Sequence, residues 1–126
     1  MSRILSPLVR DSLACVLPMQ MPAVGKPWIL EVCPASTLKR MGLYLSYKGR
    51  TTQYREARIR LVDEIQEMEL LDELDEGMRE LVVDDAGGDA LDSVIAAVAT
   101  AHAIINQSSA PVGQDDPYSI EGYVYV

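Results

Sequence analysis

The sequence predicts one α/β domain that is rich in helix and contains few strands. Three stretches carry this prediction. Residues 89–106 place small and branched apolar side chains at helical spacing. Residues 28–33 form a short, continuous apolar run, which is typical of a strand covered on both faces. Residues 120–126 are rich in Tyr and Val, and this composition favours another strand.

Size and composition limit what this domain can be. The chain has 126 residues, which is enough for a single domain with one modest core. No apolar run reaches the length of a membrane span, and the first residues lack a clean secretory cleavage site. The two cysteines, Cys15 and Cys33, provide no disulfide framework, so we expect a reduced, cytoplasmic setting.

Residues 6–27 are expected to form one short helix followed by a loop. Ser6 is a suitable N-cap and Pro7 suits the first helical position. Pro18 is expected to end this helix, and residues 20–27 are expected to form a loop because they contain two prolines and a glycine. The buried side of the helix would hold four apolar residues, Leu8, Leu13, Val16 and Leu17.

Three further helices are expected before the glycine pair Gly87–Gly88. The first covers residues 35–41 and ends at Gly42, and an extended segment, residues 43–49, follows it. The second begins at Thr51 or Thr52 and ends near Met68. The third covers residues 71–83 and is expected to bury one apolar stripe, Leu71, Leu74, Met78 and Leu81.

Charged residues on these helices are expected to face solvent. Arg55, Arg58 and Arg60 form a basic patch that would pair with nearby acids such as Asp63 and Glu64 on a solvated face. The acids of residues 72–80 would cover the outer side of the third helix.

The last helix, residues 89–106, carries two acids in its first turn, Asp89 and Asp92. Asp89 follows two glycines and suits an N-cap, with Asp92 completing a capping-box variant. Alternatively, both carboxylates hold a cation, with Asp85 as a weaker neighbour. Spacing alone favours capping. The apolar stripe of this helix comprises Leu91, Val94, Ile95, Val98, Ala101 and Ile105.

Charge and residue counts exclude several functions. The net charge of −8 does not allow binding of nucleic acid by bulk electrostatics, so acids acting on nucleic acid would have to be clustered around metal. A single histidine, His102, excludes a histidine-type zinc site and is expected to be a core or rim residue. Glu31 either faces solvent from an edge strand or stands at a ligand-binding strand end. Lys48 either binds an anion or is a solvated surface residue.

Four motifs together resemble the C-terminal half of a known family. They are WILEVCPA at residues 28–35, YKG at 47–49, GGDALDS at 87–93 and EGYVYV at 121–126. The family consists of predicted RNase H-like nucleases of unknown function, the domain of unknown function four-two-nine. The helix that begins at Asp89 is also similar to the last helix of RuvC-type resolvases.

The resemblance implies a function and a set of site residues. It implies a partial RNase H-like fold and magnesium- or manganese-dependent hydrolysis of phosphodiester bonds in nucleic acid. Glu31, Asp89 and Asp92 would be the catalytic and metal-binding acids, and Lys48 would bind substrate. Two-metal hydrolysis requires several acids to converge, which this set could supply.

One departure from the family leads to an alternative function. The family begins with a hairpin whose first strand carries a leading catalytic aspartate, and this sequence contains no counterpart. The chain is therefore expected to be a truncated form, completed by a second copy or by a partner chain that supplies the missing strands. The alternative is a non-enzymatic remnant or assembly module that docks on another chain through its apolar helix face.

Overall fold

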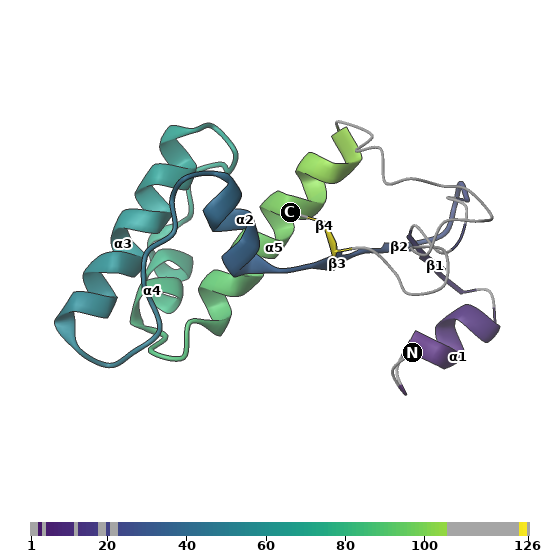
Figure 1. The fold of residues 1–126 in the computed structure, drawn as a ribbon, viewed down its shortest axis with the longest axis horizontal. Helices are drawn as coiled ribbons and strands as arrows, with labels where there is room; N and C mark the ends of the chain where they lie inside the picture. Colours follow the sequence, from purple (N-terminus) through teal and green to yellow (C-terminus); the bar gives the residue numbers. More distant parts are fainter. Residues whose placement is uncertain are drawn as a thin grey trace.

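A computed structural model describes residues 3, 5–11, 13–17, 20, 23–105 and 124–125. The chain is rich in helix and has few, short strands, which confirms the α/β prediction at this coarse level. Figure 1 shows α2 to α5 gathered together, with α1, β1 and β2 beyond one end of β3. In chain order the elements are α1 (Leu5–Arg10), β1 (Cys15–Val16), β2 (Trp28–Ile29), β3 (Glu31–Val32), α2 (Pro34–Arg40), α3 (Thr52–Glu67), α4 (Glu76–Asp84), α5 (Asp89–Ile105) and β4 (Val124–Tyr125).

The strands form two separate parallel pairs. β1 pairs with β2, and β3 pairs with β4 in a register that places Glu31 opposite Val124. The predicted strand over residues 28–33 is therefore divided at Leu30, because its two halves pair with different strands. The prediction that Leu13, Val16 and Leu17 belong to the first helix is wrong, because α1 ends at Arg10 and Val16 lies in β1. Of the predicted final strand, residues 120–123 and 126 lie outside the described residues.

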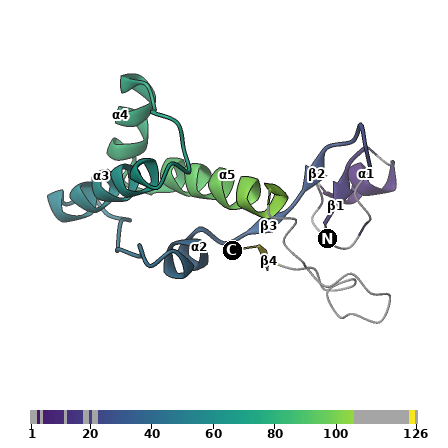
Figure 2. The same cartoon turned by 90° about the horizontal axis from the view of Figure 1, so that it is seen from above.

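The core lies between α2, α3 and α5, and Val82 of α4 also packs into it. Figure 2 shows α5 as the long central helix, with α4 projecting away from it. The spacing predicted for α3 and α5 is confirmed at the centre of both helices. The largest fully buried side chains are Leu38, Leu61, Val62, Ile65, Leu91 and Ile95. A smaller cluster joins Ala103, near the end of α5, to Leu17, Leu30 and Val32.

The start of α4 differs from the prediction. The helix begins at Glu76, because the Asp75 side chain caps it by accepting a hydrogen bond of 2.9 Å from the Met78 N–H. Leu71 and Leu74 still pack against the core, but from the segment that precedes the helix. The predicted stripe is therefore out of phase with the helix. Met78 and Leu81 are exposed, whereas Val82 and Val83 are buried.

The two predicted helix ends involving glycine gave different results. Gly42 has φ +73° just beyond α2, as predicted for a glycine that ends a helix. At the start of α5, Asp89 is the first helical residue and is not the N-cap. Asp85 caps this helix instead: its carboxylate accepts hydrogen bonds from the Ala90 N–H at 2.8 Å and the Gly87 N–H at 3.2 Å. Ala101 and Ile105 are both exposed, so the predicted stripe leaves the core from Ala101 onward.

Candidate functional site

Acidic and basic side chains meet at the N-terminal end of α5. Asp92 accepts a hydrogen bond of 2.6 Å from the Tyr47 hydroxyl on Oδ1 and one of 2.6 Å from the Lys48 ammonium on Oδ2. The Asp92 side chain is 25% exposed and that of Lys48 is 51% exposed. We call Lys48, Asp85, Asp89 and Asp92 the acid–lysine cluster. It brings together residues that lie more than forty positions apart in the sequence.

The charges of the cluster act on one another. The pKa of Lys48 is raised, first by its hydrogen bond to Asp92 and then by the charges of Asp92, Asp89 and Asp85. Burial raises the pKa of the Tyr47 hydroxyl, and the hydrogen bond to Asp92 raises it further. The Ala90 N–H lowers the pKa of Asp85, and the Gly87 N–H contributes in the same direction. Lys48 therefore stays protonated beside three carboxylates.

Close packing of Gly88 allows the cluster to form. Gly88 has φ +77°, and a Cβ at this position would lie 3.0 Å from Lys48 Cγ and 3.1 Å from Tyr47 Cε2. Only glycine adopts this backbone conformation without strain and leaves room for both side chains. Gly88 therefore lets the segment at residues 47–49 lie directly against the start of the helix.

A buried arginine fixes the same segment from the other side. Arg58 on α3 is 2% exposed, which contradicts the prediction that it lies on a solvated face. Its Nη1 donates to the Tyr47 carbonyl at 2.7 Å and to the Gly49 carbonyl at 3.0 Å, and its Nε donates to the Val83 carbonyl at 2.7 Å. Backbone carbonyls that need donors, and not surface acids, account for its position. The neighbouring Arg60 does pair with Glu64 on the surface, as predicted.

Glu31 lies apart from the cluster. Val32 packs against Ala103 near the far end of α5, and Ala103 follows Asp92 by eleven residues. At 1.5 Å per helical residue this places the two regions about 16 Å apart along α5. Glu31 is exposed, and side chains alternate along a strand, so it faces away from the surface that Val32 buries.

The predicted three-acid set is therefore not assembled. Among the described residues, no group of three or more His, Cys, Asp or Glu side chains is placed to hold a metal ion. Of the four predicted site residues, the structure brings Lys48, Asp89 and Asp92 to one end of α5 and leaves Glu31 at the other.

Tyr47 and Arg58 were not predicted as part of this arrangement, and Asp85 was predicted only as a weaker neighbour. An aspartate two positions before a glycine often forms an Asx turn, so the run Asp85-Ala86-Gly87 predicts that the Asp85 carboxylate accepts a hydrogen bond from the Gly87 N–H. No local pattern indicates Tyr47 or Arg58. Their partners are a carboxylate on a distant helix and backbone carbonyls of other segments.

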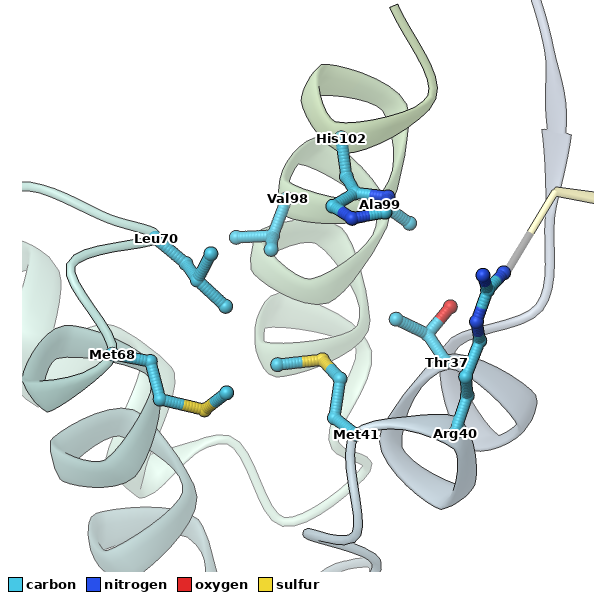
Figure 3. A pocket seen from close by; sticks show the side chains of 8 residues that line it. All are labelled: Thr37, Arg40, Met41, Met68, Leu70, Val98, Ala99 and His102. Atoms are coloured by element: carbon cyan, nitrogen blue, oxygen red, sulfur yellow. The ribbon is translucent and has the colours of Figure 1, made fainter. Parts of the chain in front are cut away.

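A separate hollow lies between α2, α5 and the end of α3. It has a volume of about 260 Å³, and Figure 3 shows Met68 and Leu70 on one side of it and Thr37 and Arg40 on the other. His102 is exposed at the rim, in agreement with one of its two expected placements. The lining contains no acid and so adds no carboxylate to the acid–lysine cluster. It consists of Thr37, Arg40, Met41, Met68, Leu70, Val98, Ala99 and His102.

Comparisons with models of known families, with curated proteins and with solved structures found no match to this chain. The family resemblance therefore depends on the four motifs in the sequence alone. Within the part of the chain that the structure describes, no single helix is both long and apolar enough to cross a membrane.

Proposed function

We propose that this chain is the acid-bearing part of a metal-dependent phosphodiesterase of the RNase H-like superfamily. One observation carries the proposal: Lys48 Nζ lies 2.6 Å from Asp92 Oδ2, and both residues were assigned to the site by the resemblance. Asp89 lies one turn earlier on the same helix. The parallel pair β3–β4 beside α5 is compatible with such a fold, although it is only two strands wide.

The donor set suits a hydrated magnesium or manganese ion better than an all-protein cage. Magnesium commonly takes one or two carboxylates and keeps several waters. Asp89 is exposed and Asp92 is partly exposed, so these two carboxylates are the proposed ligands. Asp85 is committed to capping α5, and Glu31 is withdrawn from the ligand set because of its position. Further protein ligands would come from a partner chain.

Lys48 has a defined part in this proposal. A bound divalent ion supplies Lewis-acid activation of water and phosphate. Asp89 and Asp92 would hold such an ion, and the Lys48 ammonium would then be free to donate to a phosphate oxygen of a nucleic-acid strand, for which an ammonium acts as a point charge. The exposed half of the Lys48 side chain leaves room for that contact.

A manganese titration tests the proposal. Paramagnetic broadening of amide NMR signals should begin at residues 88–93 in the wild-type chain and be lost in Asp89→Asn. Asp72→Asn is the matched control, because Asp72 is an exposed acid outside the cluster. Glu31→Gln should also leave the broadening unchanged. Broadening that persists in both Asp89→Asn and Asp92→Asn would overturn the proposal.

The second candidate function is assembly without catalysis. Both Asp92 oxygens are already bonded to protein groups, and this favours a structural role for the acid. Ile104 and Ile105 at the end of α5 are 44% and 78% exposed, and they would dock on a second chain that extends the short β3–β4 sheet. In this case Ile105→Glu should convert an associated species to monomer in light scattering. Manganese should then have no effect at residues 88–93.

A further inference from the structure

Arg58 occupies an unusual place for a charged side chain. It is 2% exposed, and its guanidinium donates three hydrogen bonds to backbone carbonyls. A buried arginine is stable only when its donors are satisfied, so these contacts define its position closely. The carbonyls belong to two separate segments, the loop at residues 47–49 and the end of α4.

One hydrogen bond of Arg58 connects α3 to the end of α4. Val83 lies in the last turn of α4, where carbonyls have no partner within the helix. A cation at a helix C-terminus also interacts favourably with the helix dipole. Arg58 therefore caps α4 from α3 and fixes the end of α4 close to the turn that leads into α5.

Two other hydrogen bonds of Arg58 connect α3 to the loop. Arg58 binds the carbonyls on both sides of Lys48, those of Tyr47 and Gly49. The Gly49 N–H then donates to the Ala86 carbonyl at 2.9 Å, which joins the loop to the turn before α5. With its backbone held on both sides, Lys48 can place its ammonium on Asp92 only in a narrow range of positions.

We infer that Arg58 is a positioning residue for the acid–lysine cluster: it holds the backbone around Lys48 so that Tyr47 and Lys48 meet Asp92. The inference depends on the proposed function only in treating the cluster as a phosphodiesterase site. The positioning itself is a property of Lys48 and Asp92 that can be measured without metal or substrate. The residue that fixes the geometry of the cluster therefore lies on α3, which contains none of the four predicted site residues.

The test follows Lys48 by NMR through its pKa, read from the ε-methylene signals. Arg58→Lys keeps a positive charge but cannot span three carbonyls, and Arg58→Met keeps only the stem. Both should lower the pKa of Lys48 toward its ordinary value, because the hydrogen bond with Asp92 loosens. Arg79→Met is the control: it removes the Arg79 bond of 2.6 Å to Asp63, which joins α3 to α4 away from the cluster. It should leave the pKa of Lys48 unchanged.

The outcomes separate this inference from the proposed function. An unchanged pKa of Lys48 in folded Arg58→Lys overturns the positioning role. A lowered pKa, together with no manganese response in the wild type, supports positioning and contradicts the phosphodiesterase. If neither Arg58 variant folds, the coupling can be measured from the other side with Asp92→Asn, because coupling between two sites is mutual. In the Asp92→Asn variant the NMR signal of the Arg58 Nε–H should shift relative to the wild type, and an unshifted signal overturns the inference.

Discussion

Gly88→Ala is the substitution that most directly perturbs the packing at the start of α5. Two penalties combine at this position. The residue has φ +77°, and the left-handed conformation costs an L-residue about 1–2 kcal/mol. The added Cβ would also lie 3.0 Å from Lys48 Cγ and 3.1 Å from Tyr47 Cε2, so both side chains would have to move. Overpacking of this kind costs about 1–3 kcal/mol, so the two penalties together come to roughly 2–5 kcal/mol.

Two other glycines allow the penalties to be measured separately. Gly42 has φ +73°, and a Cβ added there would have no neighbour within 4 Å, so Gly42→Ala should lose only the backbone strain of about 1–2 kcal/mol. Gly87 has no positive φ, and the nearest neighbour of its added Cβ would be Asp85 Oδ1 at 3.4 Å. Gly87→Ala should therefore lie within about 0.5 kcal/mol of the wild type. Urea unfolding followed by circular dichroism measures all three free energies.

The order of the three variants decides the result. A loss in Gly88→Ala that equals the loss in Gly42→Ala would refute the close approach of Tyr47 and Lys48 to α5. The acid–lysine cluster would then not exist in solution. A loss at least about 1 kcal/mol greater in Gly88→Ala supports the packing, because only that variant adds a steric clash to the backbone strain.

Three further predictions concern stability. In urea unfolding, Asp92→Asn should lower the free energy of unfolding by about 1–2 kcal/mol, which is less than for a fully buried pair because Lys48 is half exposed. Asp89→Asn should lower it by at most about 0.5 kcal/mol, and equal losses in the two variants would contradict the contact between Lys48 and Asp92. The pKa of Asp85 is lowered from 3.8 by the Ala90 N–H, so its stabilisation is present above about pH 4 and lost as the pH falls through the folded-state pKa. Asp85→Asn should therefore flatten the fall in melting temperature between about pH 5 and 2, and an unchanged fall would count against the cap. Leu81→Gln should change the free energy of unfolding by less than about 0.5 kcal/mol, whereas Val82→Ala should lower it by about 1–3 kcal/mol. The reverse order would mean that α4 buries the face that contains Leu81, as the sequence predicted.

The sequence was a good guide where apolar spacing and burial agree. The helices α3 and α5 were predicted within one or two residues because Leu61, Ile65, Leu91 and Ile95 repeat at helical spacing on the buried face. The start of α4 was not predicted, because Leu71 is partly buried from a segment that is not helical. Apolar spacing cannot distinguish these two ways of covering a core.

The candidate site shows a similar division. Lys48, Asp89 and Asp92 were assigned by the family resemblance, and the structure brings them to one end of α5. Glu31 was assigned in the same way but lies near the other end, because the neighbouring Val32 packs against the last turns of that helix. Arg58 could not be assigned from the sequence. Its role depends on carbonyl groups, which every residue has and which only the folded chain brings together.

Anomalous diffraction from crystals soaked in manganese would show whether Asp89 and Asp92 form the proposed cation site beside Lys48. We expect a manganese peak in contact with the Asp89 and Asp92 carboxylates, with the Lys48 ammonium moved off Asp92. A structure with no peak at these residues, and with Asp92 still bonded to Tyr47 and Lys48, would contradict the proposed site.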